Sequence, residues 1–193
     1  FLLAAARNNV EVVKVFLTAA AAMAQEGSLN MIVDVNASTS GALSSVDMCL
    51  GTGATILHFA TKANRLDIVK LLLEGLDFRQ SKIIPQPKNQ YMTEANINVA
   101  ESRGQTPLIV ACQDASKAIV HYLIDHGAKI SAVDRNGCNI LHFACSHGWV
   151  DVLQRLFKDT DETSIDRLLS ALNNEGLTPF EVAAIRNKQN IVR

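Results

Sequence analysis

The sequence lacks an excess of charge of either sign, and it has few aromatic side chains. Its 18 Lys and Arg residues nearly balance 19 Asp and Glu residues, so the net charge is −1, and aromatic residues make up only 5 %. Proteins that bind nucleic acid rely on clustered basic side chains, and those that bind single strands also stack bases on aromatic rings. The composition therefore argues against nucleic acid as a partner.

Paired cysteines and a long uncharged apolar run are also missing. The sequence has no CxxC pair and no spacing that suggests a disulfide framework among its four cysteines, Cys49, Cys112, Cys138 and Cys145. Reduced thiols are typical of the cytoplasm, so we expect a cytoplasmic protein, with the nucleus as the alternative. Arg7, Glu11 and Lys14 interrupt the apolar N-terminal run before the ~18 uncharged residues that a membrane span requires. No membrane insertion is predicted.

What the sequence does have is an internal repeat. Gly104-Gln105-Thr106-Pro107-Leu108 begins one unit, and Gly137-Cys138-Asn139-Ile140-Leu141 begins the next, 137 − 104 = 33 residues later. A period of this length is typical of stacked helical repeats. Hydrophobic residues make up 48 % of the chain, enough to form a continuous core between stacked units.

Fixed offsets from the motif leucine carry the same residue types in five units. The aligned motif positions are Phe1, Leu57, Leu108, Leu141 and Phe180. Alanine follows three residues later, at Ala4, Ala60, Ala111, Ala144 and Ala183. A β-branched residue follows after eleven, at Val12, Ile68, Ile119, Val152 and Ile191. The small residue lets a second helix approach closely, and the apolar positions face it.

The residue seven positions after the motif leucine predicts how the two helices are joined. These residues are Asn8, Asn64, Ala115, Gly148 and Asn187. Asn and Gly tolerate the left-handed conformation that ends a helix. Each unit is therefore predicted to contain a short helix, a left-handed stop, a second helix and an extended turn. Ala115 departs from the pattern and predicts a strained or altered turn.

This pattern resembles the ankyrin repeat, in which Gly-x-Thr-Pro-Leu-His-x-Ala-Ala opens the first helix. The clearest matches are the Gly104–Leu108 motif, Thr55-Ile56-Leu57-His58-Phe59-Ala60 and Ile68-Val69-Lys70-Leu71-Leu72-Leu73. The resemblance implies an all-α ankyrin-repeat solenoid of helix–turn–helix units with short β-hairpin-like connecting turns. It also implies that His58 and His142 bond between neighbouring units, whereas Ile109 and Glu181 replace that histidine elsewhere.

We expect residues 1–193 to form a single array with insertions. The expected units are 1–37, 51–76, 102–131, 134–158 and 173–193. The expected insertions are 18–33, 38–52, 77–94 and 159–166. An alanine run predicts a helical extension in the first insertion, Ser, Thr and Gly predict a loop in the second, and two prolines predict an extended loop in the third. In the last, Thr163 or Ser164 is predicted to cap a short extra helix.

Catalytic and metal chemistry is not expected in this segment. His142 and Cys145 share a helix face, but the repeat pattern accounts for both, and no fourth ligand stands at zinc spacing. Gly51-Thr52-Gly53-Ala54 lacks the preceding strand and the Lys of a phosphate-binding loop. We therefore expect no cofactor, no metal and no enzyme activity. For Trp149, a buried ring between the paired helices and a partner contact both remain open.

The resemblance implies a protein–protein interaction scaffold that binds through hairpin tips and the exposed end of each first helix. The positions that match are Ser102, Arg103, Gln105, Gln113 and Asp114 in the third unit, and Arg135, Asn136, Cys138, Ser146 and His147 in the fourth. The alternative is a regulatory or substrate-recruiting segment of a larger enzyme or channel. A third option is that the insertions cover the groove themselves. Because Phe1 lies inside a repeat, we expect a monomeric array within a longer chain.

Overall fold

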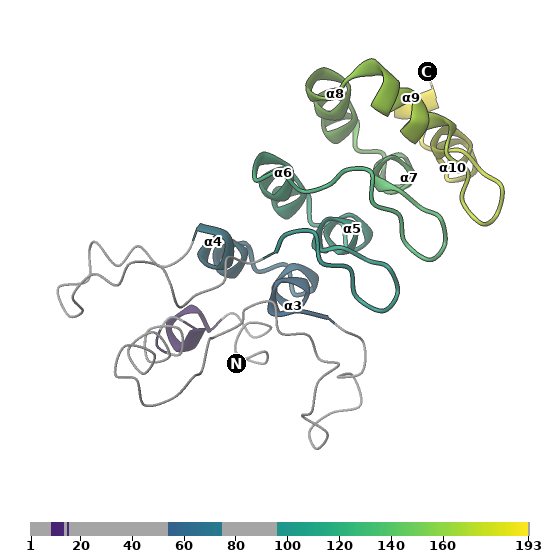
Figure 1. Ribbon diagram of the computed structural model, residues 1–193. Coiled ribbons are helices and arrows are strands. Elements are labelled where there is room, and N and C mark those ends of the chain that lie inside the picture. Colours follow the sequence, from purple (N-terminus) through teal and green to yellow (C-terminus); the bar gives the residue numbers. More distant parts are fainter. Residues whose placement is uncertain (1–8, 14, 16–53, 75–95, 193) are drawn as a thin grey trace. The chain divides into compact units, whose positions relative to one another are not determined.

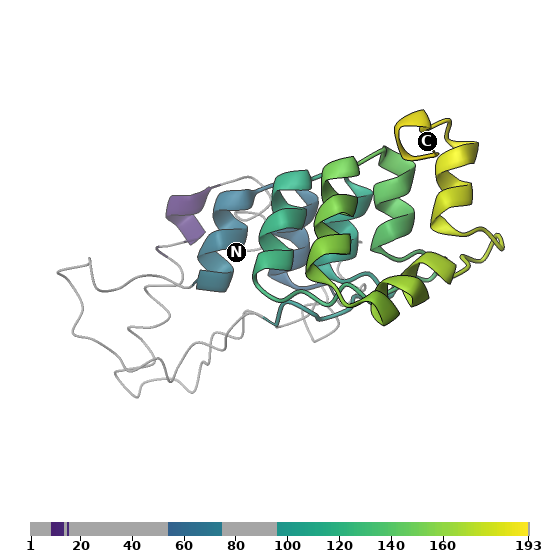
Figure 2. The same cartoon turned by 90° about the horizontal axis from the view of Figure 1, so that it is seen from above.

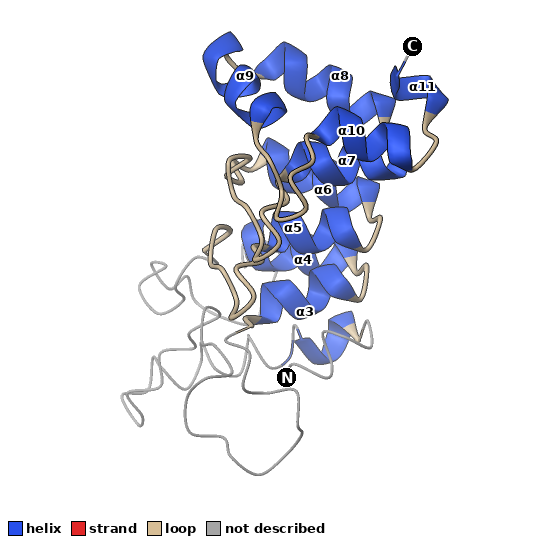
Figure 3. Ribbon diagram, turned by 90° about the vertical axis from the view of Figure 1, so that its right-hand side faces the viewer, coloured by secondary structure: helices blue, strands red, loops and turns tan. Residues whose placement is uncertain are grey.

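The computed structural model describes residues 9–13, 15, 54–74 and 96–192, and these residues form helices, turns and no strand (Figure 3). The all-α ankyrin-type architecture is therefore confirmed, and the hairpin-like turns are turns without strand pairing. The insertions predicted at 18–33, 38–52 and 77–94 lie outside the described residues.

The described helices come in consecutive pairs, with one extra helix between the last two pairs. Their bounds are α3 (Ile56–Lys62), α4 (Leu66–Glu74), α5 (Pro107–Gln113), α6 (Lys117–Asp125), α7 (Ile140–His147), α8 (Val150–Asp159), α9 (Glu162–Ser170), α10 (Pro179–Ile185) and α11 (Gln189–Val192). The chain divides into two compact parts, residues 1–101 and residues 102–193, and each is described separately.

In the N-terminal part, α3 packs against α4. The backbone N–H of Thr55 donates to Nδ1 of His58 at 3.1 Å, and the Thr55 hydroxyl lies 2.8 Å from the same nitrogen. These contacts fix the first turn of α3, where a backbone N–H has no partner within the helix. The two helices bury their apolar faces against each other, with Leu57, Ile68 and Val69 withdrawn from solvent.

In the C-terminal part, α5, α7 and α10 form one row, which we call the inner row, and α6 and α8 form an outer row (Figure 1). Seen from above, these helices lie side by side, and α9 runs across their direction (Figure 2). Ala111, Ala144 and Ala183 are completely buried, as predicted for the small residue at the point of closest helix approach. The outward projection of the turns from the helical rows is clear in Figure 3.

The predicted left-handed stops are present wherever the structure describes them. Asn64, Ala115 and Asn187 have φ values of 54°, 58° and 53°, and Gly148 has a φ of 78°. The hydrogen bond that closes the Ala115 turn, from Ser116 N–H to the Ala111 carbonyl, is 2.9 Å long, as are its counterparts in the other units. The Ala115 turn is therefore strained and not altered, because an L-residue with a Cβ pays for this conformation.

The short insertion after α8 contains the predicted extra helix, α9, but its cap differs from the prediction. The side chain of Asp161 accepts the backbone N–H of Ser164 at 2.8 Å and the hydroxyl of Thr163 at 2.6 Å. Ser164 thus stands at the third helical position, where it donates its N–H to the capping residue. The hydrogen bonds hold the pKa of Asp161 at about 2.

Candidate functional site

The tip of the fourth repeat is shaped by one buried carboxylate. Oδ1 of Asp134 accepts the backbone N–H groups of Asn136 at 2.9 Å and Cys138 at 2.8 Å. The backbone N–H of Asp134 donates in turn to the Cys138 carbonyl at 3.0 Å. A side chain that satisfies two turn amides holds the loop in one conformation. The tip is therefore an ordered structure.

The tip of the fifth repeat uses a neutral side chain at the same position. Oδ1 of Asn173 accepts the backbone N–H groups of Glu175 at 2.9 Å and Leu177 at 3.0 Å. The backbone N–H of Asn173 donates to the Leu177 carbonyl at 3.0 Å. The two tips thus have the same hydrogen-bond pattern, although one is built on Asp and the other on Asn.

Neighbouring tips are joined to one another through their backbones. Arg135 N–H donates to the Arg103 carbonyl at 3.1 Å, and Asn174 N–H donates to the Asn136 carbonyl at 2.8 Å. The Asn174 side-chain amide also donates to the Arg135 carbonyl at 2.8 Å. Three successive tips therefore form a connected edge along one side of the C-terminal part.

Gly137 permits the close approach of the last two tips. Its φ is +72°, and a Cβ built on it would lie 3.2 Å from the Asn173 Cα and 3.3 Å from the Asn174 backbone nitrogen. A side chain at this position would be strained in its own backbone and would also press on the backbone of the next tip. The fifth-unit counterpart, Gly176, has a φ of +74° with nothing within 4 Å of such a Cβ.

His142 joins the inner helix α7 to the next unit. The backbone N–H of Asn139 donates to its Nδ1 at 3.2 Å, which assigns the ring proton to Nε2, and Nε2 lies 3.1 Å from the Leu177 carbonyl. Burial lowers the pKa of His142, while the Leu177 carbonyl and Asp134 act in the opposite direction. The ring therefore stays neutral and donates across the junction, which confirms the predicted inter-unit histidine bond.

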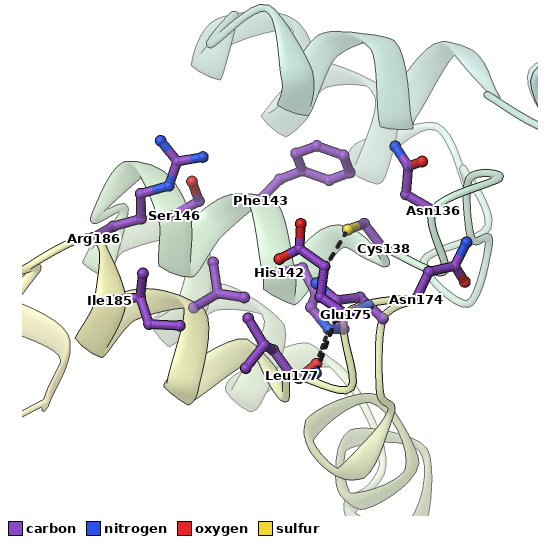
Figure 4. A pocket seen from close by; sticks show the side chains of 12 residues that line it. Asn136, Cys138, His142, Phe143, Ser146, Asn174, Glu175, Leu177, Ile185 and Arg186 are labelled. Carbon is purple, nitrogen blue, oxygen red and sulfur yellow. Dashed lines mark hydrogen bonds between the residues drawn. The ribbon is translucent and has the colours of Figure 1, made fainter.

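A groove of about 610 Å³ lies between α7 and α10 and reaches the two tips (Figure 4). The groove is lined by Asn136, Cys138, His142, Phe143, Ser146, Asn173, Asn174, Glu175, Leu177, Val182, Ile185 and Arg186. In Figure 4, Arg186 and Ser146 lie on one side of the view and Asn136 and Asn174 on the other. The wall between them includes the Phe143 ring from α7.

Three of the five fourth-unit positions predicted to bind a partner line this groove: Asn136, Cys138 and Ser146. Arg135 is exposed at the tip beside it. The His147 ring instead stacks on Trp149 with 4.8 Å between ring centroids. Trp149 itself is buried, which agrees with the first of the two interpretations of this residue.

The third-unit positions lie on the corresponding tip and helix end. Ser102, Arg103 and Asp114 are exposed. The side chains of Gln105 and Gln113 are hydrogen-bonded to each other, so the tip and the end of α5 lie side by side there. Whether these five residues contact a partner remains a prediction.

The sequence interpretation missed the fifth-unit side of the groove. The residues on this side include Asn174, Glu175, Leu177, Ile185 and Arg186. Each lies 39 positions after the corresponding fourth-unit residue, for example 174 − 135 = 39. The alignment on Leu141 and Phe180 already contained this correspondence. The repeat alignment could therefore have identified these positions, but the prediction was not extended to the fifth unit.

The thiols near the site have no chemical activation. Burial raises the pKa of Cys145 to about 11, and burial followed by the charge of Asp134 raises the pKa of Cys138. Such thiols stay protonated at neutral pH and are poor nucleophiles. Among the residues described, no group of three His, Cys, Asp or Glu side chains is arranged to hold a metal ion. No helix in the described part of the chain is long and apolar enough to cross a membrane.

Comparison with known proteins places the chain in a family. Residues 1–134 and 84–167 match the family model for ankyrin repeats (3 copies). The chain belongs to the ankyrin repeat family. Ankyrin repeats are protein-interaction modules whose stacked units present an extended binding surface, and this agrees with the connected tips and the groove.

Individual relatives carry similar repeats within longer proteins. The chain is 25 % identical over 189 residues to the transient receptor potential cation channel subfamily A member 1 of Drosophila melanogaster, which covers 79 % of this chain and 16 % of the channel. It is 36 % identical over 89 residues to the NF-kappa-B inhibitor delta of Mus musculus, covering 46 % and 26 %. It is 29 % identical over 153 residues to the B-cell lymphoma 3 protein homolog of Mus musculus, covering 77 % and 31 %. The chain thus spans less than a third of these relatives.

Proposed function

We propose that this chain binds a protein partner on the face formed by the hairpin tips and the inner row of helices. The observation that carries the proposal is the groove between α7 and α10, which is lined from both units by residues at the same repeat positions. A partner laid along the array would meet the same type of position in each successive unit.

Preorganisation of the tips supports this face as the binding surface. Asp134 and Asn173 hold their tips, and backbone hydrogen bonds join each tip to the next. A surface that is already in its bound conformation loses little conformational entropy when a partner docks. Shape and hydrogen bonding carry the interaction, and the protonated thiols of Cys138 and Cys145 favour a binding role without catalysis.

The proposed context is a cytoplasmic, monomeric array within a longer protein. Two kinds of relative support two contexts: the NF-kappa-B inhibitor favours a scaffold that binds another protein, and the cation channel favours a regulatory segment of a larger chain. In both contexts the repeats supply the binding surface. The full reading frame of the gene distinguishes them, because only the second requires a channel or catalytic domain in the same chain.

The proposed function is tested by comparing two single substitutions. Ser146→Arg fills the groove from α7, and Gln154→Arg adds the same side chain to the exposed side of α8. Proteins captured from a cell lysate by the wild-type chain should be retained by Gln154→Arg and lost from Ser146→Arg, as measured by quantitative mass spectrometry. Retention by Ser146→Arg with loss from Gln154→Arg would place the binding surface on the outer row and contradict the proposal.

The extent of the binding face is tested with charge reversals at two tips. Arg135→Glu changes the tip beside the groove, and Arg103→Glu changes the tip of the third unit. If the partner follows the connected edge, both variants should weaken capture, with the larger loss for Arg135→Glu. If Arg103→Glu captures as well as the wild type, the binding face ends at the fourth unit.

A further inference from the structure

The groove between α7 and α10 has an apolar centre. Phe143 contributes its ring from α7, and Val182 and Ile185 contribute aliphatic side chains from α10. The side chain of Ile185 is 67 % exposed, the largest exposed fraction among the big hydrophobic residues described. Covering this side chain with an apolar group of a partner would remove that surface from water.

The tip side of the groove is rich in hydrogen-bond acceptors. The Asn136 side-chain amide donates to Asp134 at 3.3 Å, and the Asn174 amide donates to Arg135 at 2.8 Å. Each of these side chains also carries an amide oxygen, which accepts hydrogen bonds. The Glu175 carboxylate, which also helps to raise the pKa of the Cys138 thiol, adds a full negative charge. This side therefore suits a cationic donor.

The α10 end of the groove carries the opposite charge. Arg186 is exposed, lies across the view from Asn136 and Asn174 in Figure 4, and has no ion-pair partner among the described residues. A guanidinium in this state can bind a carboxylate through two parallel hydrogen bonds. Glu175 likewise has no ion-pair partner in the described part of the chain. The two charges are available to a ligand and do not neutralise each other.

We propose that this groove binds a linear peptide segment in one direction, with a Lys or Arg side chain at the tips, an apolar side chain over Phe143 and Ile185, and an Asp or Glu side chain at Arg186. The proposal rests on the proposed function, since it names the chemistry of the partner at the same face. The complementary charges at the two ends set the direction of the peptide, and the apolar centre supplies its anchor.

A peptide selection tests the order of residues. Phage-displayed random 12-residue peptides are selected on the immobilised chain, and the enriched sequences are synthesised with a fluorescent label. The enriched peptides should carry a basic residue, an apolar residue and an acidic residue in that order or its reverse along the chain, with one order dominating. Failure to enrich any peptide, or enrichment without this charge pattern, would overturn the proposal.

Charge exchange on the protein provides the decisive readout. Glu175→Lys and Arg186→Glu should each weaken binding of a selected peptide by about 5- to 10-fold in fluorescence anisotropy, through loss of attraction and gain of repulsion. The double variant should regain affinity for a peptide whose basic and acidic residues are exchanged. Matched controls are Asp166→Lys and Lys158→Glu, which make the same charge changes on exposed residues of α9 and α8 and should leave affinity unchanged.

A third substitution separates this inference from the proposed function. Ile185→Asp places a charge in the apolar centre of the groove on an exposed side chain, so the fold tolerates it. Peptides that lose binding to Ile185→Asp but ignore both charge reversals would overturn the inference and leave the proposed binding face intact. Peptides that ignore all three substitutions bind outside the groove and would contradict both.

Discussion

The two junctions between repeats in residues 102–193 are held together by different kinds of interaction. Between the third and fourth units, the position of the bridging histidine is taken by Ile109, which is fully buried. Between the fourth and fifth units, His142 bonds to the Leu177 carbonyl, and the Asn139 side chain donates to the Leu168 carbonyl at 2.9 Å. The first junction is apolar on its inner side and the second is hydrogen-bonded.

The outer row carries ion pairs at the junction between the third and fourth units. Lys117 on α6 pairs with Asp151 on α8 at 2.8 Å, and Arg155 on α8 pairs with Asp125 on α6 and, at 3.3 Å, with Asp159 on its own helix. Arg155 holds the pKa of Asp125 below its ordinary value. These pairs are partly exposed and are weakened by salt. The groove thus lies at the junction whose inner side is held by neutral hydrogen bonds.

The largest expected effect comes from separating the last two tips. Gly137→Ala adds both backbone strain and a clash with the fifth tip, and should lower the free energy of unfolding by about 3 kcal/mol. Gly176→Ala carries the same strain without the clash and should cost only about 1 kcal/mol. Urea unfolding of the two variants measures the difference. Equal losses of unfolding free energy in the two variants would show that separating the last two tips costs no stability.

A second substitution converts the hydrogen-bonded junction to the apolar type. His142→Ile reproduces the side chain found at Ile109, but it leaves the Asn139 N–H without its partner and removes one of the two hydrogen bonds to the Leu177 carbonyl. The expected loss in unfolding free energy is about 2 kcal/mol, because unpaired buried polar groups are costly. An unchanged stability would mean that the two junctions are interchangeable and would remove the contrast between them.

The same histidine gives the hydrogen-bonded junction a pH dependence. Burial lowers the pKa of His142 in the folded chain, so the unfolded chain binds more protons below the ordinary His pKa of about 6.5. This contribution to stability is complete above that pH and is lost as pH falls toward the folded pKa. His142→Gln cannot titrate, so between pH 7.5 and pH 5.5 its melting temperature should fall less than that of the wild type. Parallel curves would contradict this.

The junction between the third and fourth units, which has ion pairs on its outer side, is expected to respond to salt concentration and not to changes at His142. Arg155→Met removes the pairs with Asp125 and Asp159 and should lower the melting temperature less than His142→Ile does. The loss should shrink in concentrated NaCl, because screening has already weakened the pairs in the wild type. Lys158→Met is the matched control, since Lys158 is exposed on the same helix with no ion-pair partner among the described residues. A loss that persists in high salt would assign the effect to packing of the Arg155 stem.

The smallest effect concerns the strained turn of the third unit. Ala115→Asn introduces the residue found in the left-handed turns at Asn64 and Asn187 and should stabilise the chain by about 0.5 kcal/mol. Ala118→Asn, on an exposed position inside α6, should instead destabilise it by about 0.5 kcal/mol, because Asn is the poorer helix former. The melting temperatures of the two variants should therefore shift in opposite directions. Shifts in the same direction would contradict backbone strain at Ala115.

The repeat spacing predicted the helices well because each fixed offset has a local physical cause. The buried alanines and the left-handed turns at Asn64, Gly148 and Asn187 follow from the alignment, whereas Ala115 departs from it and its left-handed turn is strained. The predicted capping residue of α9 was wrong because Asp161, Thr163 and Ser164 can each cap a helix. The residue that does so is the one directly before the first helical residue, Glu162. The roles of Asp134 and Asn173, whose side chains accept the backbone amides of the tips, were not predicted.

Burial was less predictable where it depends on a neighbouring unit. Phe180 aligns with Leu108 and Leu141, which are buried, yet Phe180 is 42 % exposed. The periodic pattern identifies the apolar face of a helix, but that face becomes buried only where a second helix packs against it.

Site-specific photo-cross-linking tests the central claim most directly. A photoreactive phenylalanine analogue replaces Phe143, whose own ring already lines the groove, or, in a second protein, Gln154 on the outer row. After irradiation in a cell lysate, the account predicts a discrete protein adduct from position 143 and none from position 154. An adduct from position 154 with none from position 143 would show that the partner binds the outer row, and the groove would lose its assigned role.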